Sequence, residues 1–329
     1  MKKIMNQPGD IVAEMLKGLE LSDPQIISFP KERVVARREK AKKVGIVSVG
    51  GSGHEPAHAG YVGKGMLDAA VAGNIFASPS PDQMLKGIQE ANAGQGILMI
   101  LMNYTGDRMN FSMAQELAEM EDIEVDHVVV KDDVAVPDST YSAGRRGIAG
   151  TILIHKIAGA MAERGASLTE VKRVAEKTVG FVRTMGMSMT ACTLPGLDKP
   201  GFVLDENEIE IGMGIHGEPG IEKTVMKTSK EIAEILVEKI LADYDYSNSE
   251  VALMINGLGA TPLIELYVLT NDVAALLREK NIQLHRVLVG NYMTSLEMAG
   301  CSVSLLKLDE ELAALLDDPC DTPGLKIMG

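Results

Sequence analysis

The stretch VGIVSVGGSGHEP, residues 44–56, places a glycine-rich loop with one histidine directly after a run of β-branched residues. A short apolar run of this kind is typical of a buried parallel strand. Open α/β sheets bind ligands at the carboxyl ends of their strands, where glycines let the backbone approach a ligand closely. The stretch therefore predicts a strand followed by a ligand-binding loop. Its spacing matches neither a Walker A loop nor the dinucleotide-binding fingerprint, and a plain glycine turn with a partly exposed histidine is the alternative.

Along the rest of the chain, short apolar runs alternate with longer segments in which apolar residues recur at helical spacing. Strands are expected at residues 44–49, 97–102, 127–130, 251–255 and 287–290. Helices are expected at residues 81–93, 111–120, 168–185, 229–244 and 262–280. Such alternation is typical of α/β proteins. The sequence thus predicts an α/β fold with two domains, each built on a mostly parallel sheet flanked by helices.

A domain boundary is predicted close to residue 185. Helical periodicity stops there, and glycine, proline and serine accumulate as far as residue 212. Residues 1–184 are expected to form an N-terminal α/β ligand-binding domain. Residues 185–329 are expected to form a C-terminal α/β domain that contributes a second glycine-rich loop with a histidine.

The composition excludes several classes of partner and site. The 329 residues include 32 Lys and Arg against 46 Asp and Glu, a formal charge of −14 at pH 7. Nucleic acids and anionic membranes are bound mainly through cationic side chains, so direct contact with either is not expected. The three cysteines are scattered and no histidine has metal-site spacing, so neither a disulfide framework nor a metal site is expected. The chain has no bilayer-length apolar run and no signal-type N-terminus, so we expect a soluble, cytoplasmic protein.

The segment MNYTGD, residues 102–107, follows the second predicted strand. It brings the carboxylate of Asp107, together with amide and hydroxyl groups, to the same edge of the predicted sheet. A carboxylate there could bind the hydroxyls of a polyol or act as a general base. The same residue types also form turns, and the alternative is that Asp107 caps the helix expected at residues 111–120.

The segment GMGIHGEPG, residues 212–220, surrounds His216 with four glycines. This composition suits neither a strand nor a helix interior, so it predicts a shaped loop that carries an exposed imidazole. A neutral imidazole nitrogen is a nucleophile, and a small carbonyl compound can add to it to form a hemiaminal. The alternative is a flexible surface loop.

Weaker candidates each have a structural alternative. Asp132 and Asp133, followed by residues 141–147, form either an anion site at a helix start or an ion-paired turn. Residues 256–262 either bind a ligand or shape a strand-to-helix turn, and the turn is favoured. Four histidines in or beside apolar segments are interpreted as structural: His58, His127, His155 and His285.

Taken together, these motifs resemble the substrate-binding subunits of the dihydroxyacetone kinase family. The resemblance runs in order along nearly the whole chain and rests on GGSGHEPAHAG (50–60), SPSPDQ (78–83), NYTGD (103–107), DDVAV (132–136), GRRG (144–147), GIHGEPG (214–220) and GLGATPL (257–263). It implies two α/β domains and, in most members, a homodimer. It also implies that ATP or ADP sits on a separate subunit, so no cofactor is expected to bind this chain directly.

The resemblance implies roles for individual residues. His216 would form a covalent hemiaminal with the carbonyl carbon of dihydroxyacetone, which would distinguish this ketone from glycerol. His54 and Asp107 would hydrogen-bond the ligand hydroxyls and act as the acid/base pair where phosphoryl transfer occurs. The residues expected to bind the ligand are Gly51, Ser52, Gly53, His54, Asp107 and His216.

Two departures from the family pattern bear on the activity. Met102 stands where the kinase subunits carry a lysine that contacts the substrate, and Val49 stands where they carry the first of three glycines. Loss of a cationic donor disfavours phosphoryl transfer, whereas trapping a ketone needs only His216 and neutral hydrogen bonds. The pattern therefore favours the family's non-catalytic paralogue, a dihydroxyacetone sensor that acts as coactivator of a TetR-type regulator of the kinase operon. The alternative is the catalytic subunit of a phosphotransferase-system-dependent kinase, whose partner is the nucleotide-binding kinase subunit.

Overall fold

The computed structural model describes residues 2–137 and 144–328, which form two compact units. The N-terminal unit contains residues 2–130, 152–179 and those from 314 onward, and the C-terminal unit contains the described part of residues 131–151 and 180–313. This division differs from the single break expected after residue 184. Residues 131–137 belong with the later segment because Thr184 exchanges backbone hydrogen bonds with Asp132 and Val134, at 2.7 and 3.0 Å.

The N-terminal unit is built on a six-stranded sheet in the order β1-β2-β4-β3-β5-β6. Its strands are β1 (Ile26–Phe29), β2 (Val34–Arg37), β3 (Gly45–Ser52), β4 (Ala69–Ile75), β5 (Ile97–Met102) and β6 (Val125–Val130). Its helices are α1 (Ile11–Ser22), α2 (Pro81–Ala91), α3 (Thr105–Glu119), α4 (Thr151–Glu163) and α5 (Leu168–Phe181), with the short 3-10 helix η1 (Ala59–Tyr61). β3 pairs in parallel with β4 and β5, and β5 pairs in parallel with β6. The predicted mostly parallel sheet is confirmed for this unit.

The central strands of this sheet are covered on both faces, which explains their continuous apolar sequences. One face packs against α2 and α3 through a core that includes Val47, Val49, Met84, Ile88 and Phe111. In the parallel register Ser48 lies opposite Ile100. The carboxyl ends of β3 and β5 therefore meet at one edge of the sheet, and the loops that follow them start side by side.

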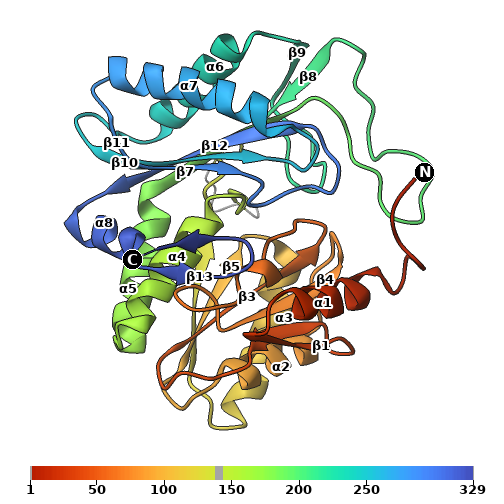
Figure 1. Ribbon diagram of the computed structural model, residues 1–329, viewed down its shortest axis with the longest axis vertical. Coiled ribbons are helices and arrows are strands. Elements are labelled where there is room, and N and C mark those ends of the chain that lie inside the picture. The colour runs from red at the N-terminus through yellow and green to blue at the C-terminus, as the bar shows by residue number, and fades with distance from the viewer. Residues whose placement is uncertain (1, 138–143, 329) are drawn as a thin grey trace. The chain divides into compact units, whose positions relative to one another are not determined.

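The C-terminal unit holds a second six-stranded sheet in the order β11-β10-β12-β7-β8-β9. Its strands are β7 (Val182–Ser188), β8 (Glu208–Ile211), β9 (Glu222–Val225), β10 (Glu250–Gly257), β11 (Gln283–Gly290) and β12 (Gly300–Leu308). The helices α6 (Ser229–Asp243) and α7 (Leu263–Glu279) lie along one face of this sheet (Figure 1). Their core residues include Leu236, Ile240, Leu266, Val273 and Leu277.

The α/β class, with two sheets flanked by helices, is confirmed, but two details of the prediction are wrong. Among the described strands of the second sheet, β10 and β11 alone pair in parallel, and the other pairings are antiparallel. The helix expected at residues 168–185 ends at Phe181, and the chain continues as β7 because Val182–Ser188 pairs with β12. The partner strand lies more than a hundred positions further along the chain, so the local sequence does not reveal that this segment forms a strand.

The last residues of the chain complete the N-terminal unit. α8 (Glu310–Asp317) leads into the two-stranded sheet of β13 (Cys320–Asp321) and β14 (Lys326–Ile327). Asp321 forms a β-bridge with Lys64, and the Gly324 N–H donates to the carbonyl of Gly60 at 2.7 Å. Arg164, just after α4, pairs with Asp318 at 2.6 Å. The unit is thus assembled from segments that are far apart in the sequence.

Candidate functional site

The glycine-rich segment that ends β3 and begins the following loop is fixed by close packing. A side chain on Gly51 would lie 2.7 Å from the backbone nitrogen of Ala77, so only glycine fits. Gly53 has φ of 100°, a conformation that strongly favours glycine. The Ser52 hydroxyl donates to the carbonyl of Gly73 at 2.8 Å. These contacts hold the loop in one conformation at the edge of the sheet.

His54 ends this loop and is 0% exposed. Its ring stacks on Phe76, with centroids 5.0 Å apart and an angle of 16° between the planes. The plain-turn alternative required a partly exposed histidine, and the structure instead buries the ring because Phe76, at the end of β4, covers it. Stacking on a second ring fixes the plane of the imidazole.

Asp107 lies at the same edge of the sheet, in the first turn of α3. This helix begins at Thr105 with Tyr104 as its N-cap, earlier than the expected start at residue 111. Asp107 is therefore inside the helix, and the alternative in which it caps the helix is wrong. The side chain is 3% exposed and lies at the positive end of the helix dipole, where a carboxylate is stabilised. The structure thus places the loop with His54 and the residue Asp107 at one edge of the N-terminal unit.

Met102 places an apolar side chain at this edge. It is the last residue of β5 and is 1% exposed. A Cβ on Gly50 would be 3.3 Å from Met102 Cε and 3.0 Å from His58 Nε2. The thioether therefore packs beneath the glycine loop, at the position where the family pattern expects a lysine.

His58 and His155 form a buried pair in the same unit. Their ring centroids are 5.2 Å apart in an edge-on arrangement, and Nδ1 of His58 is 3.3 Å from Ser48 Oγ. Burial lowers the pKa of His58 from 6.5 to about 4 and lowers the pKa of His155 well below its ordinary value. Both rings are therefore neutral at pH 7. Their burial agrees with the structural role expected for them.

In the C-terminal unit, His216 lies in the loop that connects β8 to β9. The loop is closed by hydrogen bonds from Gly214 N–H to the carbonyl of Glu218 at 3.0 Å and from Gly217 N–H to the carbonyl of Gly214 at 3.1 Å. Gly217 has φ of 83°, which favours glycine. The side chain of His216 is 20% exposed. The segment is the shaped loop with an accessible imidazole that its glycine spacing predicts.

Glu218 holds both the backbone and the ring of His216. Its Oε2 accepts the backbone N–H of His216 at 2.9 Å, and its Oε1 lies 3.0 Å from His216 Nδ1. Burial raises the pKa of the Glu218 carboxyl, but the hydrogen bond and charge of His216 outweigh this and lower it to about 2. The ionised carboxylate therefore favours the tautomer with a proton on Nδ1, which leaves the lone pair on Nε2. Sequence reasoning assigned Glu218 no role, and its position two residues after His216 was the available signal.

A salt bridge braces the start of this loop. Arg146 Nε lies 2.7 Å from Asp133 Oδ2, and Arg146 Nη2 donates to the carbonyl of Gly212 at 2.9 Å. Burial raises the pKa of Asp133 to about 6 although Arg146 opposes the shift. Asp132 accepts two backbone N–H groups. The described part of this segment is thus the ion-paired turn, while residues 141–143 lie outside the described residues.

The segment 256–262 acts as a structural turn. Asn256 accepts the backbone N–H groups of Tyr292 and Met293 at 2.8 and 3.0 Å. The Thr261 hydroxyl donates to the carbonyl of Gly300 at 2.6 Å and accepts its N–H at 2.8 Å. These polar groups are used within the fold, which agrees with the favoured interpretation.

The candidate residues divide between the two units. The N-terminal unit holds Gly51, Ser52, Gly53, His54 and Asp107, and the C-terminal unit holds His216 with its partner Glu218. Within residues 2–137 and 144–328, no group of three or more His, Cys, Asp or Glu side chains could hold a metal ion. In the same described ranges, every helix is too short or too polar to cross a membrane. The candidate residues therefore lie on two units, His54 and Asp107 on one and His216 on the other.

Comparison with known proteins identifies the family of the chain. The model of the Dak1 domain matches residues 17–324. The dihydroxyacetone-binding subunit DhaK of PTS-dependent dihydroxyacetone kinase 1 from Listeria innocua is 51% identical, over 98% of this chain and 99% of its own. The structure of the dihydroxyacetone kinase operon co-activator Dha-DhaQ is 38% identical with a TM-score of 0.90, over 97% of this chain and 98% of that chain. The dihydroxyacetone kinase of C. freundii is 36% identical with a TM-score of 0.93, over 99% of this chain and 60% of that chain. These identities favour the kinase-subunit alternative over the coactivator interpretation that Met102 suggested.

Proposed function

The chain belongs to the Dak1 family, and on that premise we propose that it is the dihydroxyacetone-binding subunit of a phosphotransferase-system-dependent dihydroxyacetone kinase. The observation that carries this proposal is the His216–Glu218 pair, which presents a nucleophilic nitrogen in a loop closed by its own hydrogen bonds. The 51% identity to a subunit of that name supports the kinase role.

The geometry of this pair supports covalent trapping of the ketone. With its Nδ1–H bonded to Glu218, His216 attacks the carbonyl carbon of dihydroxyacetone through the lone pair of Nε2. A C–N bond forms, the carbonyl π electrons move to the oxygen, and that oxygen takes a proton from solvent. The ring becomes an imidazolium, whose charge is balanced by the carboxylate 3.0 Å from Nδ1. Glycerol has no carbonyl group and cannot react in this way.

The proposed acid and base for phosphoryl transfer are His54 and Asp107. A ligand hydroxyl must lose its proton as the phosphoryl group arrives, and a carboxylate is suited to accept it. Asp107 is held in the first turn of α3, and the ring plane of His54 is fixed by Phe76. The nucleotide is proposed to remain on the separate kinase subunit, so this chain binds dihydroxyacetone and no cofactor directly.

Reconstitution tests the kinase role. Mixed with the nucleotide-binding subunit and the phosphotransferase components, the protein is expected to convert dihydroxyacetone to its phosphate. Asp107→Asn removes the base and should lower the rate by about 10²–10⁴-fold while the covalent adduct persists. Asp126→Asn, on β6 and paired with Lys172, is the matched control and should keep the wild-type rate. A full rate in Asp107→Asn would contradict the assignment.

The second candidate is a sensor that acts as coactivator of a TetR-type regulator, and the buried thioether of Met102 favours it. A site without the lysine ammonium lacks a charged donor for the transferred phosphoryl group. An intact adduct without any phosphorylation in the reconstituted system would place this candidate first. Because the chain carries a net charge of −14, such a coactivator is expected to act through the DNA-binding partner rather than on DNA itself.

A homodimer is proposed as well. Leu263, Ile264, Tyr267 and Val268 on α7 are all exposed, and exposed apolar clusters mark interaction surfaces. Sedimentation at micromolar concentration is expected to give twice the chain mass of 35.3 kDa. Tyr267→Glu places a charge within this surface and should shift the protein toward monomer, whereas Glu279→Gln at the end of α7 should not. A monomeric wild-type protein would contradict the proposal.

A further inference from the structure

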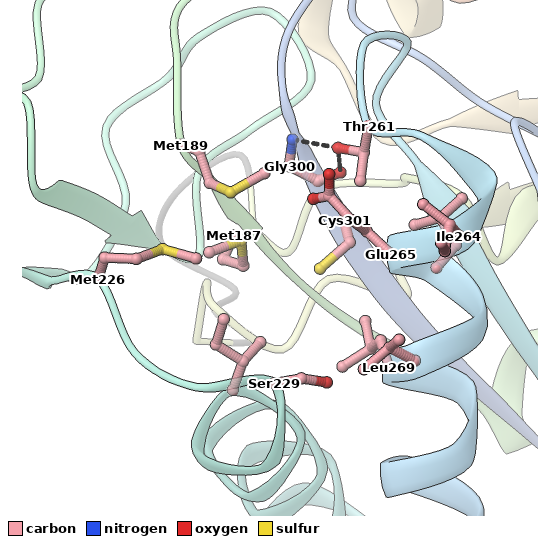
Figure 2. Close-up of a pocket in the computed structure, with 13 residues that line it drawn as sticks. Met187, Met189, Met226, Ser229, Thr261, Ile264, Glu265, Leu269, Gly300 and Cys301 are labelled. Carbon is pink, nitrogen blue, oxygen red and sulfur yellow. Dashed lines mark hydrogen bonds between the residues drawn. The ribbon is translucent and has the colours of Figure 1, made fainter.

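An apolar pocket that plays no part in the proposed chemistry lies in the C-terminal unit, between α6, α7 and the sheet (Figure 2). Its volume is about 300 Å³, at the lower end of the range for small-molecule sites. Its lining residues include Met187, Met189, Met226, Ser229, Glu265 and Leu269. A water-sized group takes about 30 Å³, so the pocket can hold a ligand of roughly ten non-hydrogen atoms.

The apolar wall is dominated by adaptable side chains. Met187 belongs to β7, Met189 follows it, and Met226 follows β9, so three separate positions supply flexible thioethers. Figure 2 shows the side chain of Met226 pointing toward Met187, across from Leu269 on α7. Methionine adjusts its shape to an occupant at low cost. The wall is therefore suited to an alkyl or aryl group.

Two polar groups stand out from this apolar lining. Ser229 Oγ is buried and, among the described residues, has no hydrogen-bond partner, although buried hydroxyls are normally paired. Glu265 brings a carboxylate to the pocket, and its charge adds to burial in raising the pKa of the Cys301 thiol to about 12. Figure 2 shows Glu265 on the side of Thr261, with Ser229 on the other side of the view. The hydroxyl of Thr261 is already used by Gly300.

We propose that this pocket binds a small amphipathic amine, whose apolar body lies among the methionines and whose head donates hydrogen bonds to Glu265. The carboxylate accepts hydrogen bonds and attracts a cation, so a protonated amine is matched and an alkyl carboxylate is repelled. The buried hydroxyl of Ser229 can accept or donate a bond to a further polar atom of the ligand. This site is independent of dihydroxyacetone binding and of His216.

A matched series of probes tests the head-group preference. Octylamine, octan-1-ol and octanoate share one apolar chain and differ in charge. Titration calorimetry on the full-length protein is expected to give at least tenfold tighter binding for octylamine than for octanoate, with octan-1-ol between them. Glu265→Gln should remove the difference between the amine and the alcohol. Glu279→Gln, at the other end of α7, is the control and should bind like the wild type.

The location is tested separately, by labelling the methionine methyl groups for NMR. Octylamine should shift the signals of Met187, Met189 and Met226 and leave the exposed Met109 and Met113 unchanged. The chain has no tryptophan, so Met226→Trp adds a single fluorophore that both fills the pocket and reports its own burial. When its emission spectrum shows that the indole is buried, this variant should bind octylamine at least tenfold more weakly than the wild type.

Several outcomes would overturn the proposal. The first is that octylamine does not bind at millimolar concentration, and the second is that all three probes bind with equal affinity. The third is that Met226→Trp, with its indole buried, binds octylamine as tightly as the wild type does. Binding that appears only in the monomeric Tyr267→Glu variant would assign the pocket to a second copy of the chain instead. None of these results depends on whether the protein phosphorylates dihydroxyacetone.

Discussion

His216→Ala is expected to form no covalent adduct with dihydroxyacetone, whereas the wild-type protein gains the mass of one ligand molecule. The variant removes the only imidazole of the loop at residues 212–220, so no ring nitrogen remains there to attack the carbonyl carbon. Intact-mass spectrometry measures the result directly. Gentle ionisation is needed because a hemiaminal reverses when the ligand is removed.

Two further variants make this test specific. His285→Ala removes a partly exposed histidine of the same unit that pairs with Glu250, and it should keep the full adduct. Glu218→Gln keeps the size of the partner but removes its charge, so the adduct should weaken by about tenfold, the loss of one charge-assisted hydrogen bond. An adduct of undiminished strength in His216→Ala would exclude this residue as the nucleophile.

His58→Gln is expected to make the protein markedly less sensitive to acid. Burial lowers the pKa of His58 from 6.5 to about 4, so the unfolded chain takes up this proton before the folded one does. The contribution of His58 to stability is therefore complete above pH 6.5 and is lost as the pH falls toward 4. At pH 5 this loss is about 2 kcal/mol, and a glutamine, which stays neutral, avoids it. Urea unfolding at pH 7.5 and pH 5 measures the difference.

Other groups shift stability in the same pH range, so the comparison is made between variant and wild type. Burial raises the pKa of Asp133 to about 6, so its protonation stabilises the folded state as the pH falls from 6 toward 3.8. This effect is common to both proteins and cancels in the difference. Adding His155→Phe should flatten the pH dependence further, because burial also lowers the pKa of His155. Identical pH dependence in His58→Gln and wild type would contradict the prediction.

The strands that could be predicted are those whose signal is local. β5 coincides with the expected strand at residues 97–102, because a strand buried on both faces is apolar at every position. β7 could not be predicted, since its pairing with β12 is decided by residues far along the chain. The start of α3 was missed because Met109 is the one large apolar residue of Thr105–Asn110, so this stretch shows no apolar stripe. The units could not be delimited from composition, because the contacts of residues 131–137 and of those after 314 are formed only in the fold.

In the candidate site, too, the residues with a local sequence signal could be predicted, and the residues that contact them from elsewhere in the chain could not. His54, Asp107 and His216 were identified because each lies in a segment whose residue types suit a loop with chemistry, and their roles stay predictions. The partners that orient these groups were not identified. Phe76 reaches His54 from the turn after β4, and the Arg146–Asp133 pair braces the His216 loop from a distant segment. Phe76 lies in none of the motifs, and the motifs that contain Asp133 and Arg146 do not reveal that these side chains brace the His216 loop, so only the folded chain shows these contacts.

The assembly of the N-terminal unit from both ends of the chain has a consequence for its synthesis. Domains generally fold in the order in which they leave the ribosome. Here the β-bridge between Lys64 and Asp321 and the pair of Arg164 with Asp318 need residues that are translated after the whole C-terminal unit. The C-terminal unit ends at residue 313, so all of its strands have been translated before that tail is made. Synthesis of the N-terminal unit therefore starts before that of the C-terminal unit and is completed after it.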